Sequence, residues 1–173
     1  MDKMDETDAQ AADLARGEPL RSATQTVEAG WIDYNGHMNV AYYTMAFDRA
    51  LDDVYDRLGI GPELVRRHNM GPMALQTQIH YLAELLEGEA FRVLVRVVDA
   101  DAKRVLIFAE MIRARDGARS ATYESLTLNV DLAARRSAPF PADAAARVEA
   151  VRAAHAGLPR PAELGAPLGI RRR

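Results

Sequence analysis

One long amphipathic segment limits what this chain can fold into. Between residues 40 and 58 apolar side chains recur every three or four positions, and charged side chains fill most of the opposite face. This spacing predicts a helix of about 19 residues, roughly 28 Å long. Asn39 is the expected N-cap and Gly59 the expected stop. A helix of that length can bury its apolar stripe only against a sheet.

Four strand-like segments follow the helix and would supply that sheet. They span residues 73–82, 90–98, 104–113 and 121–130. The third and fourth are apolar on much of both faces, which indicates central strands that are covered on both sides. Residues 22–32 alternate loosely and predict a first strand, and residues 62–68 predict a short second helix. The expected fold is α+β, with a curved antiparallel sheet of about five strands wrapped around one long central helix.

The two ends of the chain differ from this central region in composition. Residues 1–20 are acidic and rich in Ala, and they lack the basic start and apolar stretch of a signal peptide. They predict a disordered or loosely attached tail. Residues 142–173 predict a weakly amphipathic helix that docks lightly, followed by a basic tail. Residues 21–141 then form the main domain, which has the size of one ordinary domain.

The composition excludes several classes of function. The chain has 173 residues and a net charge of −3, so it lacks the basic character of a nucleic-acid-binding protein. It has no cysteine, which excludes disulfides, thiolate nucleophiles and cysteine metal sites. Its four histidines show no metal-binding spacing, and no apolar run is long enough to span a membrane. We therefore expect a cytoplasmic protein with no metal and no other cofactor.

Residue types that carry chemistry gather just before the predicted helix, in the segment Trp31-Ile-Asp-Tyr-Asn-Gly-His-Met-Asn-Val-Ala-Tyr-Tyr43. Within five residues this segment holds a carboxylate, an amide, a glycine and an imidazole, on Asp33, Asn35, Gly36 and His37. A helix N-terminus presents free N–H groups and the positive end of the helix dipole. It can therefore stabilise the oxyanion that forms when a carbonyl group is attacked. Gly36 has no side chain and allows a substrate to approach closely.

The same segment resembles the signature D-x-x-G-H-x-N-x-x-Y of hotdog-fold thioesterases related to 4-hydroxybenzoyl-CoA thioesterase. The matching residues are Asp33, Gly36, His37, Asn39 and Tyr42. More narrowly, this segment and residues 129–141 are similar to betainyl-CoA thioesterases of carnitine breakdown. The likeness covers roughly residues 21–141, and the predicted order of elements agrees with it.

The resemblance implies hydrolysis of a small acyl-CoA thioester to the free acid and CoA, with betainyl-CoA as one candidate substrate. In such families the carboxylate attacks the thioester directly or activates water, and Asp33 matches that residue. Asn35 and His37 are then candidates for positioning water or the carboxylate. The backbone N–H groups of Gly36 and His37 are candidates for the oxyanion hole. Both roles of Asp33, nucleophile and general base, stay open, as does the choice between CoA and acyl carrier protein.

The implied substrate suggests further binding residues. A quaternary ammonium group favours aromatic walls, because ring faces attract cations. The candidates for this part of the site are Trp31, Tyr34, Asn39, Tyr42, Tyr43 and Tyr81. CoA phosphates favour arginines at the pocket mouth, and the candidates are Arg113, Arg115, Arg135 and Arg136. Glu84 is expected to be an exposed charge at a strand end, with a place in the pocket wall across a subunit boundary as the alternative.

The resemblance also implies a homodimer or a dimer of dimers, with active sites at the subunit interface. Two other functions stay open. A hotdog enoyl-CoA hydratase also uses Asp and His, but its signature, D-x-N-P-x-H, has a proline between them that the segment from Asp33 to His37 lacks. A non-catalytic module that binds acyl thioesters would need the pocket but not the carboxylate.

Overall fold

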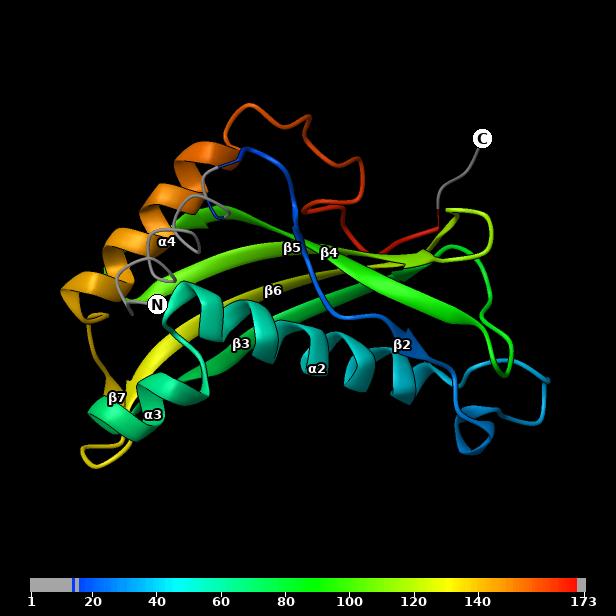
Figure 1. Ribbon diagram of the computed structural model, residues 1–173, viewed down its shortest axis with the longest axis horizontal. Helices are drawn as coiled ribbons and strands as arrows, with labels where there is room; N and C mark the ends of the chain where they lie inside the picture. Colours follow the sequence, from blue (N-terminus) through cyan, green and yellow to red (C-terminus); the bar gives the residue numbers. More distant parts are fainter. Residues whose placement is uncertain (1–13, 15, 171–173) are drawn as a thin grey trace, which may run out of the picture.

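A long helix runs along the inner face of a curved sheet in the computed structural model, which describes residues 14 and 16–170 (Figure 1). This helix, α2 (Val40–Leu58), has the predicted bounds. The side chain of Asn39 caps it, and Gly59 ends it in the left-handed conformation, with a φ of 75°. The short helix α3 (Pro62–His68) follows, also as predicted. None of the described helices is long and apolar enough to cross a membrane.

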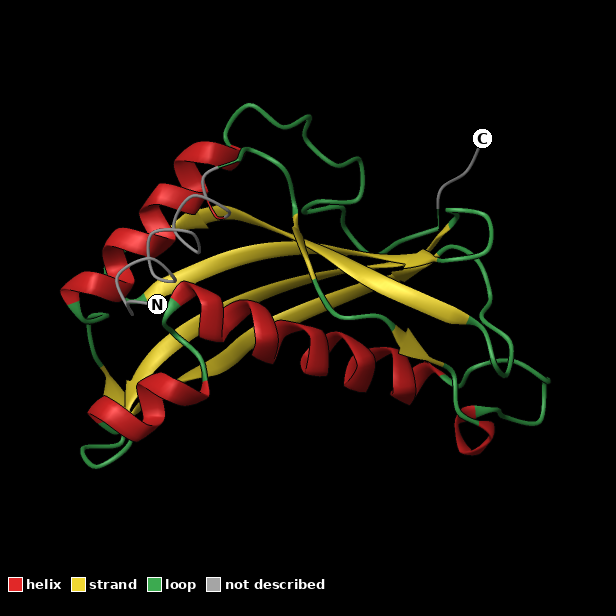
Figure 2. Cartoon of the chain, viewed as in Figure 1, coloured by secondary structure: helices red, strands yellow, loops and turns green. Residues whose placement is uncertain are grey.

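The strands around the helix form one antiparallel sheet (Figure 2). Its long strands are β3 (Met70–Tyr81), β4 (Ala90–Ala100), β5 (Arg104–Arg113) and β6 (Arg119–Asp131). They lie in the order β4-β5-β6-β3, so β5 and β6 are central and β3 lies at one edge. A short strand, β7 (Arg136–Ser137), pairs with the end of β6. This arrangement confirms the predicted α+β fold.

The predicted strand over residues 22–32 is wrong. Two short strands, β1 (Leu20–Arg21) and β2 (Gln25–Thr26), pair with β4 instead, and η1 (Ala29–Trp31) is a 3-10 helix. Between β1 and β2 the hydroxyl of Ser22 accepts the N–H of Val93 at 3.0 Å. A side chain thus occupies a position that a backbone carbonyl would fill in a continuous ladder, and the strand is interrupted there.

The apolar stripe of α2 packs against the inner face of the sheet. The ring of Phe47 stacks on Tyr123 of β6 with a centroid distance of 4.9 Å, and both side chains are buried. The Tyr55 hydroxyl lies 2.8 Å from Oγ1 of Thr127, and burial raises the pKa of Tyr55 to about 12. These contacts fix the position of α2 on the sheet, and therefore also fix where its N-terminus lies.

The C-terminal helix α4 (Ala142–His155) packs more closely than its weak stripe indicated. Val148 and Val151 are buried in the same apolar core as α2. Ala144 and His155 are buried on the same helix, which lies against β4. The division into a domain at residues 21–141 and a separate C-terminal part stays a prediction.

The chain joins the core before Arg21, because Leu14 and Leu20 are buried. The rest of the predicted N-terminal tail, residues 1–13 and 15, lies outside the described residues, as do residues 171–173 of the predicted basic tail. A buried histidine binds the backbone of the described part of this segment. Nδ1 of His155 accepts the N–H of Val97 at 3.0 Å, and Nε2 donates to the carbonyl of Glu18 at 2.9 Å.

We expect His155 to make folding stability depend on pH in the acid range. Burial lowers the pKa of His155 below its usual value, and the nearby charge of Arg96 acts in the same direction. The unfolded chain therefore binds a proton more readily than the folded chain. The stability contribution is complete above the unfolded pKa of about 6.5. It is lost as the pH falls through that value toward the lower pKa of the folded state.

Urea unfolding between about pH 7.5 and pH 5 measures this dependence. His155→Gln should flatten the decline in the free energy of unfolding, whereas His68→Gln, at an exposed position, should leave it unchanged. An equal decline in the parent chain and in His155→Gln would show that other groups cause it.

Candidate active site

The predicted catalytic residues lie in one tight loop between η1 and α2. An isolated antiparallel bridge between Ile32 and Met38 closes the loop. Inside it the N–H of Asp33 donates to the carbonyl of His37 at 3.0 Å, and the N–H of Gly36 donates to the carbonyl of Asp33 at 3.0 Å. Gly36 has a φ of 83°, a conformation that residues with a side chain rarely adopt. The local sequence therefore folds the loop against the start of α2.

Both carboxylate oxygens of Asp33 have neighbouring donors. Oδ1 accepts the N–H of Asn35 at 2.8 Å, and Oδ2 lies 3.5 Å from Nδ2 of Asn39. Asn39 also caps α2, because its own Oδ1 accepts the N–H of Ala41 at 3.0 Å. This confirms the predicted cap. A single amide side chain thus fixes the start of the helix and contacts the half-buried carboxylate.

Two backbone N–H groups beside the carboxylate have no acceptor within the described part of the chain. They belong to His37 and to Val40, the first residue of α2. The N–H groups of Asn35 and Gly36 already donate to Asp33. At Val40 the helix dipole adds a partial positive charge. The free donors available to an oxyanion are therefore at His37 and Val40, while Gly36 closes the loop.

A pocket of about 390 Å³ lies next to these donors. It is lined by His37, Met38, Val40, Tyr43, Tyr81, Leu82, Ala83 and Glu84. The rings of Tyr43 and Tyr81 meet edge to face, with a centroid distance of 5.2 Å and an interplanar angle of 86°. Tyr43 is buried, and this burial raises its pKa, so its hydroxyl stays neutral at ordinary pH. The pocket combines mainly apolar and aromatic walls with one carboxylate, that of Glu84, and Asp33 is not among these lining residues.

The wall opposite the catalytic loop is the segment after β3. The N–H of Met38 donates to the carbonyl of Leu85 at 2.8 Å, which joins this segment to the loop. From the other side Nη1 of Arg113 donates to the carbonyl of Glu84 at 2.9 Å. The remaining guanidinium nitrogens of Arg113 bind the carboxylate of Asp116 at 3.0 and 2.8 Å. Arg113 is therefore buried behind the pocket wall and holds the backbone of this segment in place.

The predicted aromatic residues separate into two groups. Tyr43 and Tyr81 line the pocket. Trp31 is buried and stacks on Tyr42 with a centroid distance of 5.5 Å, so these two rings pack against each other outside the pocket lining. Tyr34 at the loop tip is 96% exposed. Within one subunit, the aromatic wall therefore consists of two tyrosines.

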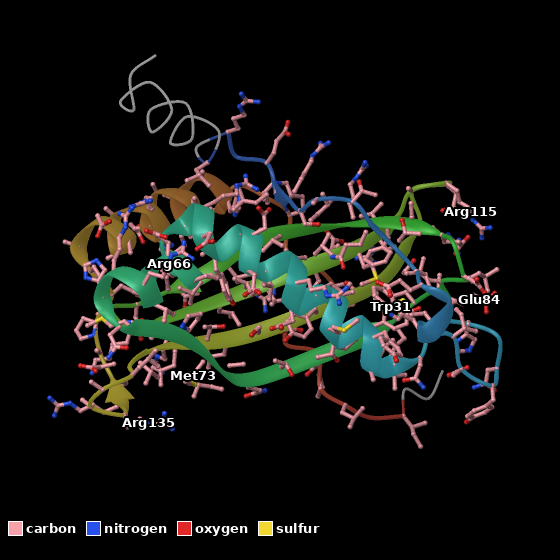
Figure 3. All side chains as sticks on the ribbon, turned by 60° about the horizontal axis from the view of Figure 1, so that its bottom comes forward. Trp31, Arg66, Met73, Glu84, Arg115 and Arg135 are labelled. Carbon is pink, nitrogen blue, oxygen red and sulfur yellow. The ribbon has the colours of Figure 1, made fainter. Side chains whose placement is uncertain are left out.

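The predicted arginines also lie in different places. Figure 3 shows Arg115 at the same end of the molecule as Trp31 and Glu84, and Arg135 at the opposite end. Arg115 is exposed and forms a 2.9 Å ion pair with Glu89. Arg136, in β7, is also exposed and follows Arg135 directly. Among the described residues no group of three or more His, Asp or Glu side chains could hold a metal ion.

The sequence did not predict Val40 as a pocket residue. For Glu84 it favoured an exposed charge over a place in the pocket wall. Glu84 is exposed, as expected, and it also lines the pocket. The sequence gives little indication that Glu84 lies in the pocket wall. The segment around Glu84 is joined to the loop of Asp33 by a long-range contact, the hydrogen bond between Met38 and Leu85.

Comparisons with known proteins agree with this fold. The family model described as Thioesterase-like superfamily matches residues 27–148. The betainyl-CoA thioesterase of Pseudomonas aeruginosa is 32% identical over 140 residues, which cover 81% of this chain and 88% of that protein. The L-carnitine dehydrogenase/betainyl-CoA thioesterase of a Rhizobium species is 32% identical over 161 residues, which cover 93% of this chain but only 32% of that longer protein.

A solved structure gives the same result at the level of the fold. A hypothetical protein from Staphylococcus aureus, determined in complex with CoA, superposes with a TM-score of 0.81 at 25% sequence identity. The match covers 89% of this chain and 98% of that one. Together with the sequence matches, it confirms the hotdog fold that the motif led us to expect.

Proposed function

The chain belongs to the thioesterase-like superfamily and hydrolyses acyl-CoA thioesters, and we propose that betainyl-CoA is its substrate. The observation that carries the proposal is the placement of Asp33. Its carboxylate lies beside the N-cap of α2, in the loop whose residues His37 and Val40 carry two free N–H groups and line a pocket with aromatic walls. Such a site supplies a base or nucleophile, an oxyanion hole and room for a small acyl group.

In the proposed reaction the thioester carbonyl oxygen accepts hydrogen bonds from the N–H groups of His37 and Val40. These donors stabilise the negative charge that forms on this oxygen during attack. The attacking oxygen comes from a water molecule that Asp33 deprotonates, or from Asp33 itself with hydrolysis of the resulting anhydride. In both routes the C–S bond breaks and CoA leaves as its thiol after taking up a proton. Asn39 positions the carboxylate for this step.

The acyl group of the proposed substrate fits the other half of the pocket. Betaine carries a trimethylammonium group, which has no N–H and cannot donate a conventional hydrogen bond. Aromatic faces attract such a cation by about 0.5–2 kcal/mol. Tyr43 and Tyr81 supply these faces close to the thioester position.

Release of free CoA, measured with a thiol reagent, tests the proposal. We expect betainyl-CoA to be cleaved with a higher kcat/KM than acetyl-CoA or butyryl-CoA. Hydration of an enoyl-CoA without release of thiol would instead favour a hydratase. Tight binding of betainyl-CoA without turnover would favour a non-catalytic binding module.

The site also favours a dimer built through β3. Within the described part of the chain, β6 is the only long strand that pairs with β3, so its other edge is open. Met73 and Leu75 on this strand are 43% and 53% exposed. A long apolar edge promotes aggregation unless another strand or layer covers it. A second copy of the chain covers it most simply, and two-fold symmetry makes the two β3 strands antiparallel.

This pairing brings separated arginines together. It places the Met70 end of one β3 strand beside the Tyr81 end of the other, and β7 lies at the Met70 end. Arg135 and Arg136 of one copy then approach the end of the other copy that carries the pocket and Arg115. We assign these three exposed arginines to the CoA phosphates, because Arg113 is buried and bound to Asp116. The dimer of dimers and the cytoplasmic location stay predictions.

A further inference from the structure

We propose that Glu84 selects a cationic acyl group by placing its negative charge in the acyl half of the pocket. This proposal rests on the proposed function, because it concerns how the same site tells betainyl-CoA from neutral thioesters. Glu84 lines the pocket together with Tyr43 and Tyr81. It is the only carboxylate among the lining residues that the structure describes.

The backbone on both sides of Glu84 is anchored. The N–H groups of Leu82 and Ala83 both donate to the carbonyl of Ser120, at 2.9 and 3.1 Å. The carbonyl of Glu84 accepts from Arg113, and the carbonyl of Leu85 accepts from the catalytic loop. A charge on an anchored backbone needs little reorganisation when a ligand binds. The segment therefore presents Glu84 to the pocket before the substrate arrives.

The other charged side chains near this pocket wall form ion pairs with one another. Arg113 pairs with Asp116 at 2.8 Å, and Arg115 pairs with Glu89 at 2.9 Å. Glu84 forms no ion pair within the described part of the chain. Its carboxylate thus gives this wall a net negative charge. The charge reaches the pocket interior, because Glu84 helps to raise the pKa of Tyr43, after burial and Tyr81, while the smaller effect of Arg113 lowers this pKa.

The bound acyl group determines whether this charge helps or hinders. A trimethylammonium group in the pocket, against the wall that Tyr81 and Glu84 form, neutralises it at short range. A neutral acyl group of the same shape displaces water from the carboxylate and offers no compensating charge. Discrimination then arises from both attraction of the cation and rejection of the neutral group.

A matched pair of substrates measures this discrimination. In 3,3-dimethylbutanoyl-CoA a quaternary carbon replaces the nitrogen of betainyl-CoA, so the two acyl groups differ in charge but hardly in shape. The parent enzyme should prefer betainyl-CoA, as the ratio of the two kcat/KM values. Glu84→Gln should lower this ratio by about two- to fivefold, as expected for an exposed charge. Glu84→Asp keeps the charge and should retain most of the preference.

Glu87→Gln is the matched control, because Glu87 is an exposed carboxylate of the same segment outside the pocket lining. It should leave the ratio unchanged. A parent enzyme without preference for betainyl-CoA would contradict the proposed substrate, whatever Glu84 does. A parent enzyme that prefers betainyl-CoA, with Glu84→Gln equally selective and equally stable to heat, would overturn the role of Glu84 alone.

Discussion

Asp33→Asn is expected to lower the kcat for thioester hydrolysis by about 10²- to 10⁴-fold, the range typical of losing a catalytic acid or base. An amide can neither take a proton from water nor attack the carbonyl carbon at a useful rate. The Oδ1 of the new side chain can still accept the N–H of Asn35, so the loop should keep its shape. Thiol release under single-turnover conditions measures the chemical step, and equilibrium binding of the acyl-CoA measures affinity separately.

We expect this variant to bind the thioester and to melt at nearly the parent temperature. Asp99→Asn is a suitable control, because Asp99 is exposed and bonds only the adjacent backbone N–H of Ala100 among the interactions of the described residues. It should leave kcat unchanged. If Asp33→Asn retained a kcat within a few-fold of the parent value, Asp33 would have no part in the chemistry, and the oxyanion donors alone would have to explain the rate.

Leu75→Lys should convert the proposed dimer to a monomer and reduce activity together with assembly. Leu75 lies in the middle of the exposed part of β3, at a register shift in its pairing with β6. A two-fold axis near this point places both new ammonium groups in the same apolar contact. Burying such unpaired like charges costs at least about 3 kcal/mol, which raises the dissociation constant about a hundredfold or more.

Sedimentation velocity at several concentrations measures the assembly, and thiol release at the same concentrations measures activity. In the monomer the pocket loses Arg135 and Arg136 of the second copy, so KM for the CoA thioester should rise. Leu168→Lys introduces the same charge at a fully exposed position outside β3 and should change neither quantity. A Leu75→Lys variant that stays a dimer with the parent KM would exclude β3 as the interface.

The parts of the fold that depend on local signals were predictable from the sequence. Both ends of α2 follow from single residues, the capping amide of Asn39 and the left-handed Gly59. The central place of β5 and β6 follows from their two apolar faces. The first strand was wrong because the side chain of Ser22 interrupts the ladder, and a pattern of alternating residues does not show this.

The site was only partly predictable, for a similar reason. The motif predicts a catalytic role for Asp33, which stays a proposal, and the structure places this residue in the loop before α2. The motif could not show that Trp31 stacks on Tyr42 outside the pocket, or that Glu84 lies in the pocket wall. These placements depend on contacts between segments far apart in the chain, such as that between Met38 and Leu85.

Asn39 links the stability of the first turn of α2 to the orientation of the Asp33 carboxylate. Since one amide both starts α2 and contacts the reactive carboxylate, fraying of the first helical turn would also release the acid from its orientation. Thermodynamic reciprocity then requires that a ligand which tightens the acid should also protect the amide hydrogens of that turn from exchange. Bound substrate would therefore stabilise the first turn of α2, which is the turn that holds the carboxylate of Asp33 in its orientation.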